Sequence, residues 1–398
     1  MNGRYDFDKV INRRGTDAIK WDVPEDRIPM WIADMDFQTA PEIREAMAER
    51  LEHGVFGYGN VPKRWNEAYR KWWQERHGLT MDEDALVFCT GVIPAISSAV
   101  RKFTTPNENV LIETPVYNTF YNSIINNGCR VLECPLRYEN GSYSMDFENL
   151  EKKLSDPQTT LMILCNPHNP IGKIWSREEL AKVGELAKKH HVIVISDEIH
   201  CDITVPGKGY VPFASVSDTC REVSITCIAP TKTFNLAGIQ TAAVYAPNPV
   251  LRHKIWRALN TDEVAEPNSF AVPAAIAAFE RGGEWLDAMR EYVFENRRYV
   301  TETLAAAVPD VFVVPGEATY LLWIDVNALP GDSSAIAAFL REKAGLELLE
   351  GIIYGAAGAH HLRMNVACPR SLCEEGTKRL IEGLRMYRET VQGHFENS

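Results

Sequence analysis

The sequence predicts an α/β fold in which a mostly parallel sheet lies between helices, with a smaller α+β region beside it. Strand-length apolar runs such as 160–165 and 192–196 lack polar alternation, which is typical of strands buried on both faces. Helical segments separate these runs, as connections between parallel strands require. With 398 residues, 45% of them hydrophobic, the chain can fill one large or two smaller domains.

The expected elements of the sheet region alternate along the chain. Two helices come first, one beginning near Pro41 and one covering 65–77. Strands and helices then follow in this order: strand 85–89, a helix from Pro94, strand 109–113, a helix from Asn118, strand 160–165, helix 177–190, and strands 192–196, 223–228 and 242–245. Ser176 stands where it can cap helix 177–190.

The remaining chain predicts a second, smaller unit. Helices 271–280 and 285–307 are long, and the latter is expected to cross into this unit. Its expected elements are strands 311–314, 320–325 and 361–366 and helices 334–344 and 372–392. We therefore expect an N-terminal arm, 1–45, that belongs to the small domain, a large domain, 46–288, and a small C-terminal domain, 289–398.

Composition narrows the possible partners. The net charge is −12, from 42 basic and 54 acidic residues, and no basic run stands out, so we expect no nucleic acid partner. The apolar runs are far shorter than the roughly 20 residues that span a bilayer, and the N-terminus lacks the apolar core of a signal peptide. Nine cysteines form no CxxC pair, which favours buried free thiols in a reducing compartment. We expect a cytoplasmic protein without membrane contact.

Polar side chains follow two of the expected strands, and a lysine follows a third. Strand 160–165 leads to Asn169, strand 192–196 to Asp197 and His200, and strand 223–228 to Lys232. The carboxyl ends of parallel strands line a ligand crevice. An amide, an acid and a lysine that converge there can hold the oxygen, the ring nitrogen and the aldehyde of pyridoxal phosphate (PLP).

Six segments carry a resemblance to a known family: 29–37, 114–117, 166–173, 197–200, 232–238 and 363–370. With these segments in this order, the chain resembles the fold-type I PLP enzymes of the class I/II aminotransferase superfamily. Within that superfamily it is most similar to the MalY/PatB-like cystathionine β-lyases, which are C–S lyases. The resemblance covers nearly the whole chain. It implies a seven-stranded sheet in the large, PLP-binding domain and a homodimer with shared active sites.

The resemblance gives the polar residues roles around the cofactor. Lys232 is expected to bind PLP covalently and then to remove the substrate Cα proton, and Asp197 to pair with the pyridine nitrogen. Asn169 and His200 are expected at the ring oxygen, and Tyr117 against the ring face. Structural alternatives stay open, since Asp197 could cap a helix, Asn169 could serve a turn, and His200 and Tyr117 could belong to the core.

Phosphate and substrate binding draw on further residues. Gly91, Val92 and Ile93 begin a helix whose N–H groups can bind a phosphate, with Thr231 and the partner subunit's Tyr58 as further contacts implied by the resemblance. Arg363, with Ala33 nearby, is expected to bind the substrate carboxylate. Structural alternatives stay open here too: residues 91–93 could form an ordinary turn, Tyr58 could be a loop aromatic and Arg363 a surface arginine.

Two positions depart from the wider superfamily, because Gln240 replaces a phosphate-binding arginine and Ala229 replaces a serine. No metal is assigned, because the adjacent pairs His190, His191 and His360, His361 rarely converge on one ion.

The expected reaction is α,β-elimination from L-cystathionine or a related cysteine S-conjugate, giving a thiol such as homocysteine, pyruvate and ammonia. This reaction would place the enzyme, a cystathionine or cysteine S-conjugate β-lyase, in methionine biosynthesis and amino-acid metabolism. The alternative is an aminotransferase, which begins with the same proton removal. A PLP-sensing regulator without catalysis is disfavoured, because no segment is left for a DNA-binding domain and every catalytic residue is present.

Overall fold

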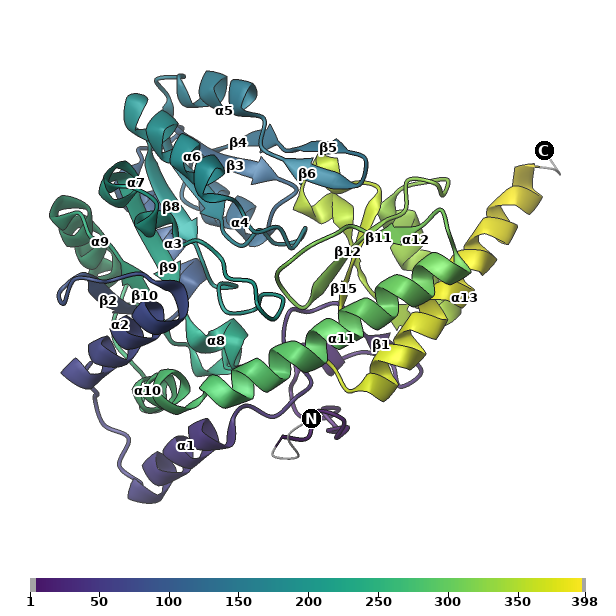
Figure 1. Cartoon of the computed structure of the whole chain (residues 1–398), viewed down its shortest axis with the longest axis horizontal. Coiled ribbons are helices and arrows are strands. Elements are labelled where there is room, and N and C mark those ends of the chain that lie inside the picture. The colour runs from purple at the N-terminus through teal and green to yellow at the C-terminus, as the bar shows by residue number, and fades with distance from the viewer. Residues whose placement is uncertain (1–4, 396–398) are drawn as a thin grey trace.

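The computed structural model describes residues 5–395, with side chains up to Val391. Figure 1 shows a large sheet flanked by helices and a smaller sheet beside it, with the long helices α11 and α13 packed together. No helix of this described part is both long and apolar enough to cross a membrane.

The large sheet and its helices occupy most of the first three quarters of the chain. Their bounds are α1 Pro41–His53, α2 Lys63–His77, β2 Leu86–Cys89, α3 Val92–Phe103, β3 Asn109–Thr114, α4 Thr119–Ile125, β4 Arg130–Pro135, β5 Arg137–Glu139, β6 Ser142–Ser144, α5 Phe147–Leu154, β7 Thr159–Cys165, α6 Arg177–Lys189, β8 Ile193–Asp197, α7 Asp218–Val223, β9 Ser224–Ile228, α8 Pro230–Thr233, β10 Ala242–Tyr245, α9 Pro249–Thr261 and α10 Ala271–Arg281.

The smaller sheet and its helices follow. Their bounds are α11 Gly283–Ala307, β11 Phe312–Val313, β12 Leu321–Asp325, α12 Ser333–Phe339, β13 Leu346–Glu347, β14 Leu349–Glu350, β15 His361–Asn365 and α13 Arg370–Phe395. The arm contributes β1 Ile28–Pro29, which pairs in parallel with β13. The division into domains at residue 288 stays a prediction.

The predicted fold class is confirmed by the strand order. The seven-stranded sheet runs β2-β10-β9-β8-β7-β3-β4, and only β10 is antiparallel to its neighbours. Helices α3, α4 and α9 contribute to the apolar core on one face, and α5, α6 and α7 to the core on the other. The smaller sheet is antiparallel, with the order β11-β12-β15-β14.

Most predicted elements are found within a few residues of their predicted ends. Helix α6 begins after Ser176, whose hydroxyl accepts from the Glu179 N–H in a capping box. Strand β4 was not predicted, because this edge strand exposes Arg130 and Pro135 and lacks a continuous apolar run. Helices α5 and α7 and the hairpin β5–β6, which are short, were also missed, and so was the 13-residue helix α9.

Glu113 is one of the buried carboxylic acids of the large sheet. Glu113 on β3 is 2% exposed, and neither carboxylate oxygen has a hydrogen-bond partner. Burial raises the pKa of Glu113 from 4.5 to about 8, with a smaller contribution from Glu179. The folded protein therefore holds a proton that the unfolded chain loses above about pH 4.5. The stability associated with this proton declines as the pH rises toward 8.

Replacing Glu113 with Gln should stabilise the protein increasingly between pH 5 and pH 8, reaching about 3–5 kcal/mol near pH 8. The amide has the same shape and carries no charge to bury. Thermal unfolding midpoints of both proteins across this range measure the effect. The exposed Glu148→Gln serves as the control and should leave the pH dependence unchanged. A midpoint difference that stays constant with pH would show that Glu113 does not titrate there.

Candidate active site

Three adjacent parallel strands deliver the predicted polar residues to one edge of the large sheet. Strands β7, β8 and β9 are neighbours, and Asp197 is the last residue of β8. Asn169 follows β7, and Lys232 lies in α8, the short helix after β9. The site therefore forms where the carboxyl ends of the strands meet.

Lys232 is partly exposed, but its amine is enclosed by protein groups. Its Nζ donates a hydrogen bond to the Ala33 carbonyl at 2.5 Å. Burial, followed by the positive charge of Arg363, lowers the pKa of Lys232 to about 8, against the opposing influence of Asp34 and Asp197. More of this amine is therefore unprotonated near neutral pH than of an ordinary lysine, which favours a role as nucleophile or base.

Asp197 and His200 are both buried, and burial shifts each toward its neutral form. The pKa of Asp197 is raised to about 7, mainly by burial, although the Ile199 N–H donates to Oδ1 at 3.1 Å and Lys232 lies nearby. The pKa of His200 is lowered to about 3 by burial and then by the charges of Lys232 and Arg363. His200 Nδ1 has no hydrogen-bond partner. A buried acid such as Asp197 suits a ligand with a cationic ring nitrogen, because the cation favours the ionised carboxylate.

Arg363 lies on β15 and reaches toward the Asn169 loop. Its Nη1 donates to Asn169 Oδ1 at 3.4 Å and its Nη2 to the Trp31 carbonyl at 2.9 Å. The guanidinium is 5.1 Å from the Tyr354 ring centroid, and its Nε has no partner. Within residues 5–395, no carboxylate forms an ion pair with this buried cation, so the site is suited to an anionic ligand.

The residues predicted to bind the phosphate form no side-chain hydrogen bond with Lys232, Asp197 or Arg363 in the described part of the chain. Gly91 precedes α3, whose first turn has no side-chain cap and so keeps N–H groups for an anion. Thr231 is next to Lys232 in sequence. Tyr117, predicted against the ring face, follows β3 and lies close to Tyr320 and Tyr354, whose pKa values are raised by burial and further by Tyr117. Tyr58 is fully exposed on the loop after α1 and is not brought into the cluster by this chain.

The structure adds residues that the sequence did not single out. The Tyr320 hydroxyl donates to the Ala33 carbonyl at 3.0 Å, and Asp34 lies near enough to Lys232 to raise its pKa. Tyr354 packs against Arg363 from the glycine-rich loop 351–358. This loop is closely packed, because a Cβ on Gly351 would lie 2.2 Å from the Gly358 carbonyl.

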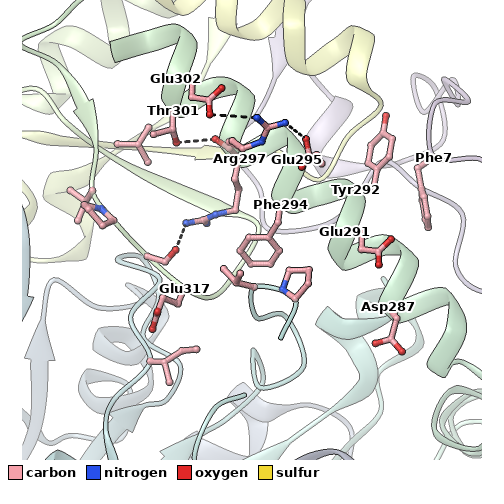
Figure 2. Close-up of a pocket in the computed structure, with 18 of the residues that line it drawn as sticks. Phe7, Asp287, Glu291, Tyr292, Phe294, Glu295, Arg297, Thr301, Glu302 and Glu317 are labelled. Atoms are coloured by element: carbon pink, nitrogen blue, oxygen red, sulfur yellow. Dashed lines mark hydrogen bonds and ion pairs between the residues drawn. The ribbon is translucent and has the colours of Figure 1, made fainter. Parts of the chain in front are cut away.

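A wide groove lies elsewhere and contains none of the predicted site residues. It has a volume of about 1570 Å³ and follows α11, where Figure 2 shows Phe294, Arg297 and Glu317 along its wall. Several of its charged side chains are paired within the wall, as Arg298 is with Glu295 and Glu302. The size of the groove is therefore no argument that catalysis occurs there.

The residues around Lys232 fit a PLP group. They offer an amine with a lowered pKa, a buried acid for a ring nitrogen, an amide for a ring oxygen and unpaired donors on Arg363 for a carboxylate. The fold and this constellation together define a PLP-dependent enzyme built on a mostly parallel sheet.

The chain belongs to the aminotransferase class I and II family, whose model matches residues 26–380. It is 41% identical to cystathionine β-lyase PatB of Bacillus subtilis, over 95% of this chain and 99% of that protein. It is 35% identical to the protein MalY of Escherichia coli, over 96% and 100%. The structure of cystalysin from Treponema denticola, which contains PLP, superposes with a TM-score of 0.93 at 32% identity, covering 96% and 99%. The family is PLP-dependent.

Replacing Arg363 with Lys should raise KM for the amino-acid substrate about 30-fold or more, because a two-pronged contact worth about 2 kcal/mol is lost. Steady-state kinetics measure this, with the visible absorbance of bound PLP as a check on cofactor retention. Arg370→Lys is the matched control, because Arg370 also lies 5.1 Å from a tyrosine ring, that of Tyr299. An unchanged KM in the Arg363 variant would remove this residue from the substrate site.

Proposed function

We propose that this protein is a PLP-dependent C–S β-lyase that acts on L-cystathionine or related cysteine S-conjugates. The products are a thiol, which is homocysteine from cystathionine, together with pyruvate and ammonia, and one water is consumed. The observation that carries the proposal is Lys232, an amine of lowered pKa with Arg363 close enough to influence its charge. The relatives named cystathionine β-lyase and cystalysin support this reaction class.

Each side chain of the proposed site has its own role in the reaction. Arg363 binds the substrate carboxylate and so fixes the orientation of Cα, and Lys232 accepts the Cα proton. Bound PLP supplies an electron sink, which the carboxylate of Asp197 strengthens by keeping the ring nitrogen protonated. Asn169, held by Arg363, keeps its amide N–H groups for the ring oxygen. With the Cα proton on Lys232, a thiolate on Cβ can leave.

An aminotransferase remains the second candidate, because it removes the same Cα proton and returns it to the cofactor. The products decide between the two reactions. Elimination destroys the amino acid without a second substrate, whereas transamination converts the cofactor to its amine form and needs a 2-oxo acid to continue.

Under single-turnover conditions with L-cystathionine, pyruvate and homocysteine should form in equal amounts without accumulation of the amine form of the cofactor. Pyruvate and free-thiol assays, with and without a 2-oxo acid, measure this partition. Lys232→Ala should lower the rate at least about a thousandfold, because the base and the covalent attachment are both lost. Accumulation of the amine form without pyruvate would identify an aminotransferase instead.

We further propose a homodimer in which Tyr58 of one subunit completes the site of the other. The loop 54–60 is exposed throughout, and its apolar residues Val55, Phe56 and Tyr58 are among the most exposed large side chains of the described chain. Such a loop suits burial against a second copy.

We also propose a cytoplasmic location, which the nine free and buried cysteines support.

Mixing inactive Tyr58→Ala and Lys232→Ala proteins under subunit exchange should restore activity to about a quarter of the sites, because random pairing makes half of the dimers mixed and each has one intact site. Lys232→Ala mixed with Arg363→Ala is the control and should restore nothing, since both residues belong to one subunit's site. Equal behaviour of the two mixtures would contradict the shared site, as would a fully active monomer in size-resolved assays.

A further inference from the structure

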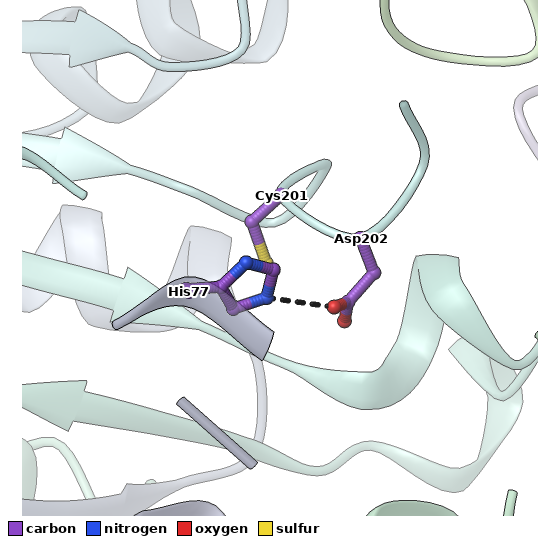
Figure 3. Close-up of side chains that lie close together, drawn as sticks. All are labelled: His77, Cys201 and Asp202. Carbon is purple, nitrogen blue, oxygen red and sulfur yellow. Dashed lines mark hydrogen bonds and ion pairs between the residues drawn. The ribbon is translucent and has the colours of Figure 1, made fainter. Parts of the chain in front are cut away.

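A buried carboxylate lies directly behind the candidate site, in the turns that follow β8. Asp202 is 3% exposed and accepts three side-chain hydrogen bonds. Trp72 Nε1 and His77 Nε2 donate to Oδ1 at 3.0 and 2.8 Å, and Thr233 Oγ1 donates to Oδ2 at 3.0 Å. Figure 3 shows His77 directed at this carboxylate. Asp202 therefore joins α2, α8 and the turns after β8 at one point.

The third of these hydrogen bonds reaches the residue next to Lys232. Helix α8 has only four residues, Pro230–Thr233, and no side chain caps its start. Thr233 is fully buried, while Lys232 is partly exposed toward the site. Successive residues of a helical turn point in directions about 100° apart. A hydrogen bond that fixes Thr233 therefore also fixes the rotation of α8, and with it the direction of the Lys232 side chain.

Asp202 also belongs to a cluster with metal-ligand chemistry. The ligand atoms of His77, Cys201 and Asp202 lie within 4.8 Å of one another. Burial raises the pKa of the Cys201 thiol well above its usual range, so this sulfur stays protonated and is a poor ligand. Burial would raise the pKa of Asp202 as well, but the donors from His77, Trp72 and Thr233 outweigh it and lower the pKa. The cluster is thus a hydrogen-bond network around an ionised Asp202, in which His77 Nδ1 has no partner among the described residues.

We propose that Asp202 and Thr233 are positioning residues, which hold α8 in the rotation that directs Lys232 at its reaction partner. The inference rests on the proposed role of Lys232, but not on whether the reaction is elimination or transamination. Asp202 touches neither Lys232 nor a reacting atom in this arrangement; it acts through the Thr233 hydroxyl. That hydroxyl can be removed with almost no change in side-chain shape.

The test compares Thr233→Val, which removes the hydroxyl, with Thr233→Ser, which keeps it. In the PLP-loaded protein, Thr233→Val should lower kcat about tenfold and leave KM within about twofold, because substrate binding depends on Arg363. The visible circular dichroism of bound PLP, which reports how the cofactor is held, should change in the same variant. Thr233→Ser should restore both signals to near the wild-type values.

Trp72→Phe is the matched control, because it removes another donor from Asp202 without touching α8 through a hydrogen bond. It should lower the thermal unfolding midpoint and leave kcat and the dichroism nearly unchanged. The proposal is overturned if Thr233→Val matches wild type in both signals, or if Trp72→Phe lowers kcat as much as Thr233→Val does. A wild-type protein without lyase activity would refute the proposed function alone, since the dichroism of the variants still decides this inference.

Discussion

The site depends on how the N-terminal arm is held between the two sheets. The Asn365 amide donates to the carbonyls of Ile32 and Asp34, each at 2.6 Å. The Asn235 side chain accepts a hydrogen bond from the Met35 N–H at 3.0 Å and donates one to the Met35 carbonyl at 2.9 Å. Two cationic side chains of the site bind the backbone of the same segment, because Arg363 donates to the Trp31 carbonyl and Lys232 to the Ala33 carbonyl. The arm thus fixes Lys232 and Arg363 relative to each other, although Lys232 follows the large sheet and Arg363 lies on the smaller one.

Burial, rather than pairing of charges, dominates the electrostatics of this site. It is the largest influence on the pKa values of Lys232, Asp197 and His200, and it moves all three toward their neutral forms. A site in this condition gains most from a ligand that brings the missing charges. A cationic ring nitrogen beside Asp197 and a carboxylate beside Arg363 would each compensate a charge whose burial is otherwise costly. The proposed cofactor and substrate supply both.

The sequence predicted the parts of the site that local rules govern. Asn169, Asp197 and Lys232 could be identified because each follows a recognisable apolar strand, and the parallel order of those strands brings their ends together. The contact between Asp202 and Thr233 could not, because these residues are 31 positions apart and no local pattern specifies such a contact. The contact between Tyr354 and Arg363 spans nine positions, but it joins a loop to a strand, and no periodic pattern predicts it. Strand β4 was missed for the opposite reason, since its exposed position on the sheet edge removes the apolar run on which prediction depends.

A second connection between the two sheets runs through the 316–319 turn. Arg297 on α11 is buried, and its side chain donates to four backbone carbonyls, those of Gly316, Ala318, Thr319 and Leu321. The N–H groups of Glu317 and Ala318 in turn donate to the Gly172 carbonyl at 2.8 and 2.9 Å, three residues beyond Asn169. The loop that carries Asn169 is therefore held by Arg363 on one side and by the 316–319 turn on the other. Because both anchors belong to the smaller sheet and its helices, Asn169 is held in place relative to Arg363, and the arm in turn holds Arg363 relative to Lys232.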